Sequence, residues 1–219
     1  MTLLQLRTRV RERLDDTNAP YLWSDDELNF EINRAVNEAC LRNNNLITDS
    51  ETASVCELSL LVGTNSYAIS DKILKIWRIK LPSALKPIMA LGYKAFDDSL
   101  EQDWEVRDGT PTGFALDIQQ RKIVLSHKPI VAETATMVVA RLPLVDLSDD
   151  SDVPEMDEQW HYDLRDFACY AALLKRDVDA EAMSQGLRYL ANFNSVFGER
   201  KDHEHGLKSY PRRSVARFV

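Results

Sequence analysis

Two short segments hold side chains of the types that bind metal ions. His203, Glu204 and His205 are consecutive near the end of the chain, and the run Asp149–Asp152 contains three carboxylates. Histidines two residues apart diverge on a helix, and no third ligand accompanies them if they share one face of a strand. The acidic run lacks the glycine and the terminal glutamate of an EF-hand loop, so a lead-in to a helix explains it better. We therefore predict no metal and no cofactor.

Pairs of carboxylates are the other groups that could do chemistry, as a general acid with a general base. Such a pair needs a pocket and two well-separated pKa values, and the sequence shows neither. The chain also lacks the G-x-S-x-G, H-E-x-x-H, Walker and C-x-x-C motifs. We predict that the protein is not an enzyme. The alternative is a hydrolase that uses Glu101 with Asp103 or with Glu155 as its acid pair.

The composition excludes several classes of function. The chain has 219 residues, of which 44% are hydrophobic, and this is enough for a sizeable core. Its formal net charge of −8 argues against nucleic-acid binding by the whole surface. No run is long enough to span a membrane and the N-terminus lacks a signal-peptide block, so we expect a cytosol-like compartment. Cys40, Cys56 and Cys169 lie far apart and are expected to be buried thiols.

Charge is separated along the chain. Residues 146–163 hold eight acidic residues and no lysine or arginine. Basic residues gather instead in residues 7–13 and after residue 206, where the tail has no acidic residue. This pattern favours contacts between acidic and basic segments of adjacent copies or of a partner. The tail residues that we predict to bind a partner are Lys208, Tyr210, Arg212, Arg213, Arg217 and Phe218.

Two helices are predicted at the start of the chain. Residues 2–15 place four aliphatic side chains on one stripe, with arginines on both sides. In one interpretation, the arginine stems cover the edges of the stripe and keep their charges in water. In the alternative, the arginines form a basic face that pairs with an acidic surface of a partner. Ser24 and Glu27 predict a capping box for a second helix. Asn43, Asn44 and Asn45 are expected to end it, since asparagine tolerates a left-handed cap. The two helices are expected to pack as a hairpin.

The middle of the chain is predicted to be rich in strands. Alternating apolar residues and turn signals indicate a small antiparallel sheet or sandwich. The expected strands span residues 56–61, 67–69, 73–81, 114–118, 122–126 and 134–142, and a short helix is expected over residues 93–102.

Helices return after Pro154. The first, over residues 158–176, is hydrophobic on every side and must be covered on every side. The N-terminal hairpin with the strand-rich part could cover it, or the same region of a neighbouring subunit. A last helix is predicted over residues 179–198, with a buried stripe of Met183, Leu187, Leu190 and Phe197 that Tyr189 and Phe193 widen. The residues proposed for a subunit interface are Arg7, Arg11, Cys169 and Leu173.

These elements predict an α+β fold. The N-terminal and C-terminal helices would form one helical bundle, with a β-rich antiparallel insert between them. The expected segments are a helical hairpin over 1–50, the insert over 51–146, the C-terminal helices over 147–202 and an extended basic tail over 203–219.

Taken in order, several motifs resemble the head-to-tail adaptor family of tailed bacteriophages, also called connector or head-completion proteins. None of them is a catalytic signature. The motifs are Trp23–Leu28 (Trp-Ser-Asp-Asp-Glu-Leu), Asn33–Ala39 (Asn-x-Ala-x-x-Glu), Trp104 with Gly109–Phe114, Lys122–Leu125, Pro129, Arg141–Pro143 and Ser151–Glu155.

The resemblance implies a structural virion protein at the junction of head and tail. It would form a ring of twelve copies beneath the portal protein, with the tail segment on the portal and a downstream tail or nozzle protein as a second partner. Assembly would take place in the host cytoplasm, without a membrane, and the genome would pass through without specific binding. Net negative charge suits such a conduit because it repels phosphates. Two alternatives stay open: a virion-carried cell-wall hydrolase, and a small DNA-binding regulator that uses the four arginines of residues 7–13.

Overall fold

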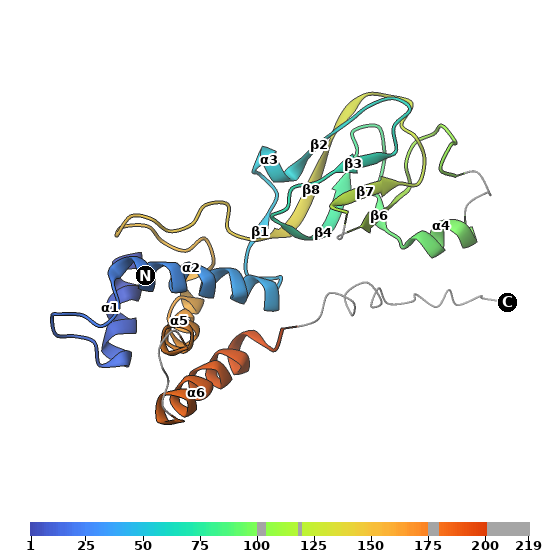
Figure 1. The fold of residues 1–219 in the computed structure, drawn as a ribbon. Coiled ribbons are helices and arrows are strands. Elements are labelled where there is room, and N and C mark those ends of the chain that lie inside the picture. The colour runs from blue at the N-terminus through green and yellow to red at the C-terminus, as the bar shows by residue number, and fades with distance from the viewer. Residues whose placement is uncertain (100–103, 118–119, 175–179, 201–219) are drawn as a thin grey trace. The chain divides into compact units, whose positions relative to one another are not determined.

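The structure is a computed structural model that describes residues 1–99, 104–117, 120–174 and 180–200. The chain forms two compact units, which are treated separately below. The helical unit combines residues 1–48 with residues 140–200, and the strand-rich unit contains residues 49–139 (Figure 1). Helices from both ends of the chain thus enclose a strand-rich middle in sequence, which confirms the predicted α+β class.

The helical unit is built from α1 (Leu3–Leu14), α2 (Asp25–Arg42), the short 3-10 helix η1 (Glu158–Trp160), α5 (Leu164–Leu173) and α6 (Ala180–Phe197). Both N-terminal helices begin with a capping box, in which the cap side chain and the third helical residue satisfy each other's backbone N–H groups. The box of Ser24 and Glu27 is the predicted one. The predicted left-handed cap at Asn43 is wrong, because its backbone is extended with φ of −122°.

The helix predicted over residues 158–176 is two elements. η1 ends at Trp160 and α5 begins only at Leu164. Between them, the imidazole of His161 is 1% exposed, and its Nε2 lies 2.8 Å from the carbonyl oxygen of Met156. This side-chain contact with the preceding loop accompanies the break.

His161 is also a buried titratable group. Burial lowers its pKa, and the hydrogen bond to the Met156 carbonyl opposes this shift. Its Nδ1 lies 2.7 Å from the N-terminal amine of Met1, and the carboxylate of Glu158 is near the same amine at 3.5 Å. A neutral imidazole that donates from Nε2 and accepts at Nδ1 satisfies both contacts.

We predict that His161 makes stability depend on pH. Because its folded pKa lies below the unfolded value of about 6.5, the unfolded state takes up the proton first as the pH falls. The contribution is therefore complete above about pH 6.5 and is lost below it, by at most about 1.4 kcal/mol per pH unit. The free energy of unfolding, measured with urea between about pH 7.5 and pH 5.5, should depend less steeply on pH in His161→Gln than in the wild type or in His127→Gln. An unchanged slope in His161→Gln would contradict the assignment.

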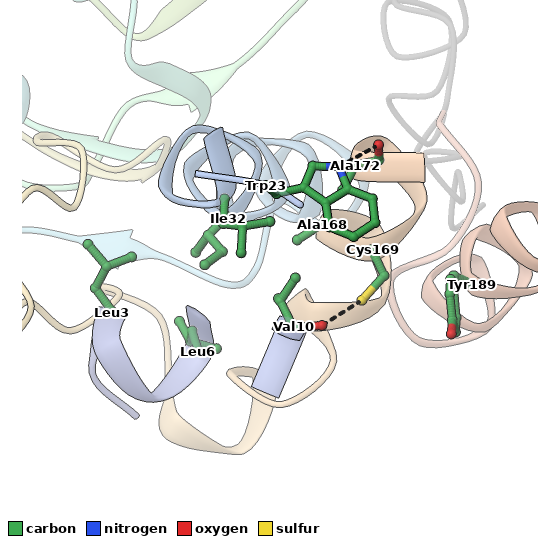
Figure 2. Packing of buried hydrophobic residues seen from close by; sticks show 10 residues of the cluster. Leu3, Leu6, Val10, Trp23, Ile32, Ala168, Cys169, Ala172 and Tyr189 are labelled. Carbon is green, nitrogen blue, oxygen red and sulfur yellow. Dashed lines mark hydrogen bonds between the residues drawn. The ribbon is translucent and has the colours of Figure 1, made fainter. Parts of the chain in front are cut away.

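The apolar helix α5 is covered within its own chain. It packs against α1, α2 and α6. Figure 2 shows the resulting core, in which the indole nitrogen of Trp23 donates to the carbonyl oxygen of Ala172 at 3.2 Å. The fully or nearly buried members of this core are Leu3, Leu6, Val10, Trp23, Leu28, Ile32, Ala168, Cys169, Ala172 and Tyr189.

The stripe predicted for α6 is partly wrong. Met183 and Leu187 are 54% and 52% exposed, whereas Tyr189, Phe193 and Phe197 are buried. Gly186 lies on the buried face against α5, where an added Cβ would be 3.6 Å from the ring of Tyr170, an ordinary contact distance. The aromatic side chains of this face pack on other rings: the ring centroid of Phe193 lies 5.1 Å from that of Phe167 on α5 and 4.6 Å from that of Phe197. Met183 and Leu187 lie on the opposite side.

The strand-rich unit holds two sheets. One has the order β1-β8-β2, with β4 also paired to β8, and the other has the order β3-β7-β6-β5. Two short helices accompany them, α3 (Ala53–Cys56) and α4 (Tyr93–Ser99). The strands are β1 (Thr48–Asp49), β2 (Glu57–Leu60), β3 (Ser66–Ala68), β4 (Ile73–Lys80), β5 (Met89–Ala90), β6 (Gly113–Asp117), β7 (Lys122–Leu125) and β8 (Glu133–Arg141).

Three strand pairs are antiparallel, as predicted, and one pair is parallel. β2 pairs antiparallel with β8, and β7 pairs antiparallel with β3 and β6. β5 and β6 are parallel, with Met89 opposite Gly113. Parallel neighbours need a crossover connection, and the segment that contains α4 supplies it.

Candidate functional site

A groove of about 400 Å³ lies between α2 and the loop of residues 143–155. Val145 and Val153 on its walls are 74% and 52% exposed. Its rim carries Asp146, Asp152 and Glu155, so we call it the acidic groove. The residues that line it are Asn33, Val36, Asn37, Pro143, Leu144, Val145, Asp146, Leu147, Asp152, Val153, Pro154 and Glu155.

Backbone hydrogen bonds fix the loop of this groove to both N-terminal helices. The amide of Asn33 on α2 donates to the carbonyl of Leu147 at 2.8 Å and accepts its N–H at 2.7 Å. The N–H groups of Leu3 and Leu4 donate to loop carbonyl oxygens at 2.8 and 3.1 Å. N–H groups in the first turn of a helix have no intrahelical acceptor, so the loop satisfies them. The groove is therefore preformed.

Two carboxylates shape the loop from inside. Asp152 accepts the backbone N–H groups of Ser148 and Asp149, both at 2.8 Å, and these bonds hold the pKa of Asp152 below its usual range. Glu155 accepts the N–H of Leu144 at 2.6 Å and pairs with Arg141 at 2.5 Å. Glu155 is thus paired with a cation, whereas the carboxylate of Asp152 is held by backbone N–H groups.

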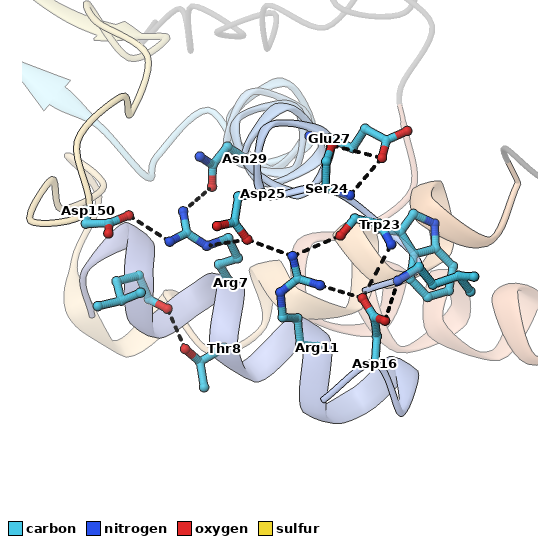
Figure 3. Close-up of polar contacts among 12 residues, drawn as sticks. Arg7, Thr8, Arg11, Asp16, Trp23, Ser24, Asp25, Glu27, Asn29 and Asp150 are labelled. Carbon is cyan, nitrogen blue, oxygen red and sulfur yellow. Dashed lines mark hydrogen bonds and ion pairs between the residues drawn. The ribbon is translucent and has the colours of Figure 1, made fainter. Parts of the chain in front are cut away.

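The two arginines proposed for an interface lie in an ion-pair network within the chain (Figure 3). Arg7 pairs with Asp25 at 3.3 Å and with Asp150 at 2.8 Å. Arg11 pairs with Asp16 at 2.5 Å and with Asp25 at 2.6 Å. Both arginines are 8% exposed, so the expectation that their charges stay in water is wrong. Oppositely charged groups from the following turn, α2 and the groove loop draw them inward.

The other two residues proposed for an interface belong to the core of the helical unit or its edge. Cys169 is fully buried, and its thiol points to the carbonyl oxygen of Val10 at 3.9 Å (Figure 2). Burial, with a smaller contribution from Asp166, raises the pKa of this thiol to about 12. Leu173 is partly buried against the same core. Because one chain accounts for these contacts, the reason for placing Arg7, Arg11 and Cys169 at a subunit interface no longer applies.

The predicted partner-binding tail lies outside the described residues. The same holds for His203, Glu204 and His205 and for Glu101 and Asp103 of the hydrolase alternative. Among the residues that the structure describes, no three His, Cys, Asp or Glu side chains converge in a way that could hold a metal. None of the described helices has the length and apolarity that crossing a membrane requires.

The acidic groove is not predicted from the sequence. Residues 149–152 of its loop indicate an acidic lead-in to a helix, but Val145, Leu147 and Val153 lie among the acidic residues and line the groove. The available signal was this mixture of aliphatic and acidic residues in one loop. The thiol of Cys40 lies behind the loop in a buried position, where burial and the charge of Glu155 raise its pKa to about 12.

One comparison with known proteins finds a relationship. A family model described as SU10 adaptor protein matches residues 1–216. Among curated proteins, no match is found. The family match includes both units and every motif on which the resemblance to phage adaptors was based.

Proposed function

The chain belongs to the SU10 adaptor protein family, and on this premise we propose that it forms a ring that joins the portal protein to the tail. A structural adaptor protein of a bacteriophage is the function that the family match supports, and the family is not an enzyme family. The ring would contain twelve copies at the head-to-tail junction of the virion and would form part of the DNA conduit. The single observation that carries the proposal is the match over residues 1–216.

The segment proposed to contact the portal is the basic tail. It carries four lysines and arginines after residue 206 and no acidic residue, together with Tyr210 and Phe218. A segment of this composition gains order when it binds an oppositely charged or apolar surface. The other proposed partner is a downstream tail or nozzle protein, and assembly would take place in the host cytoplasm before the genome passes through the channel.

The two alternative functions have less support. Glu155, one acid of the proposed hydrolase pair, is bound to Arg141 and to the backbone of Leu144. The DNA-binding hypothesis required one face with four arginines, but Arg7 and Arg11 are buried in ion pairs. Neither alternative has a described site of its own.

Deletion of residues 206–219 tests the role of the tail. We expect the truncated protein to lose docking to purified portal while its circular dichroism stays unchanged, because the helical core ends with α6 at Phe197. Electron microscopy of protein mixed with portal should show stacked rings for the wild type only. A matched control replaces Lys208, Arg212, Arg213 and Arg217 with glutamine, which keeps the length and removes the charge. Normal docking of the truncated protein would show that the tail assignment is wrong.

A further inference from the structure

Five large hydrophobic side chains are exposed on three loops of the strand-rich unit. Their exposed fractions range from 52% to 104%. Exposed apolar clusters of this kind mark interaction sites on otherwise soluble surfaces. We call this cluster the apolar knob; its members are Leu61, Val62, Leu85, Ile130 and Val131.

Hydrogen bonds hold the three loops of the knob side by side. The N–H of Gly63 donates to the carbonyl of Pro129 at 3.0 Å, which joins the first loop to the third. Ser83 donates to the carboxylate of Glu133 from its N–H at 2.8 Å and from its hydroxyl at 2.6 Å, which joins the second loop to the start of β8. Leu60 and Glu133 are also paired in the β2–β8 ladder. The apolar side chains therefore share one end of the unit.

The first loop of the knob is fixed in shape. The hydroxyl of Tyr67 accepts the N–H of Leu61 at 3.1 Å and lies within hydrogen-bonding distance of the carbonyl oxygens of Leu61 and Thr64. The ring of Tyr67 is itself buried. A surface that is ordered before binding loses less conformational entropy on association. The knob thus has the character of a preformed binding surface.

The knob and the acidic groove are complementary in polarity and in charge. Lys80, Lys86 and Lys128 lie next in sequence to the strands and loops of the knob, and the carboxylate of Glu133 is bound to Ser83. Asp108 also lies beside Lys128, so the knob has a mixed rim in which lysines are the groups available to acidic residues of the groove. The groove loop of residues 143–155 contains five acidic residues and no lysine or arginine. Both surfaces have an apolar centre with charges at the rim, the arrangement that gives a protein interface its affinity and its orientation.

We propose that copies of this protein associate head to tail, with the apolar knob of one copy in the acidic groove of the next. One chain carries both surfaces, so each copy can use its knob on one neighbour and its groove on the other. A heterologous contact of this kind closes into a ring when the rotation between copies allows it. The inference rests on the proposed ring and names the surfaces that would build it.

Two variants and their mixture test the proposal. The knob variant carries Val62→Asp and Ile130→Asp, and the groove variant carries Val145→Lys and Val153→Lys; all four side chains are more than half exposed. Each variant alone should lose assembly on the portal, with association weakened about 100-fold. Mixed together, the variants should form one-to-one pairs only, because one intact knob and one intact groove remain between them. Native mass spectrometry and sedimentation velocity distinguish pairs from rings.

A matched control and a cross-link make the outcome decisive. Val106→Asp lies in the same unit, at a side chain that is 65% exposed and outside the knob, and should assemble as the wild type does. A mixture of Val62→Cys protein with Val145→Cys protein should form an intermolecular disulfide under mild oxidation, whereas neither alone should. The native Cys40, Cys56 and Cys169 are buried and should not compete.

The possible failures separate the two proposals. Normal rings from both the knob and the groove variants would overturn the knob-in-groove contact and leave the ring proposal in place. The knob variant could instead form normal rings but no longer bind a downstream tail protein. That result would assign the knob to the tail protein and would also overturn the knob-in-groove contact. If the wild type forms no ring on the portal, the ring proposal fails. The cross-link between Val62→Cys and Val145→Cys then decides the contact by itself, and its absence overturns it.

Discussion

Replacement of Arg11 with alanine is expected to lower the free energy of unfolding of the helical unit by about 3–5 kcal/mol. The guanidinium of Arg11 is buried between Asp16 and Asp25 and also donates to the carbonyl oxygen of Trp23 at 2.9 Å. Its removal leaves the carboxylate of Asp16, which is 6% exposed, without its nearest counter-ion. A buried charge that loses its partner costs far more than an exposed ion pair contributes.

Urea unfolding followed by circular dichroism at the helix band measures this loss. Arg9→Ala is the matched control on the same helix, because Arg9 is exposed and, among the described residues, pairs with Glu12 alone. Its cost should stay within about 0.5 kcal/mol. The double variant Arg11→Met with Asp16→Asn should lose less than the sum of the single changes, since it removes both charges together. Equal costs for Arg11→Ala and Arg9→Ala would show that the network does not stabilise the protein.

This network gives a physical meaning to the motif Trp23–Leu28. Asp25 accepts both buried arginines, Ser24 and Glu27 cap α2, and Leu28 is fully buried in the core. The segment therefore anchors the start of α2 on α1. A motif that identifies the family can thus be a folding motif, and the binding surface has to be sought elsewhere.

The elements that could be predicted from the sequence are those with local signals. The strand expected over residues 73–81 is β4 (Ile73–Lys80), whose isoleucine-rich run between turn signals indicates a strand. Its buried residues, Ile73, Ile76 and Ile79, lie three positions apart and do not follow a strict alternation. The capping box of Ser24 and Glu27 was predicted because its two residues lie one helical turn apart. The three cysteines are buried and free, as their scattered positions indicated.

The features that could not be predicted depend on residues far apart in the chain. Arg7 is buried because Asp150, 143 residues away, reaches it from the groove loop. Both faces of α6 are apolar in sequence, and the buried one is the face on which Phe193 packs against Phe167 of α5. The acidic groove likewise depends on distant hydrogen bonds, including that of Asn33 on α2 with the backbone of Leu147. Sequence periodicity carries no record of such distant pairings.

Replacement of Trp23 with alanine is the second change with a large expected effect, a loss of about 3–5 kcal/mol in the free energy of unfolding of the helical unit. The side chain is 5% exposed and lies in the core formed by α1, α2 and α5 (Figure 2). Alanine would leave a cavity among residues such as Ile32 and Ala168, and the surrounding helices could fill it only in part. Chemical unfolding followed by circular dichroism measures the loss.

Trp23→Phe separates packing from hydrogen bonding at the same position. Phenylalanine keeps most of the buried ring but cannot donate to the carbonyl of Ala172, which belongs to the last turn of α5 and lies 3.2 Å from the indole nitrogen. Loss of this one hydrogen bond should cost about 1–3 kcal/mol, less than the cavity. Leu187→Ala, at a half-exposed position on α6, should stay within about 1 kcal/mol of the wild type. If Trp23→Phe lowered the free energy of unfolding as much as Trp23→Ala does, the indole would stabilise the protein mainly through its hydrogen bond to the end of α5. The volume that it fills in the core would then contribute little.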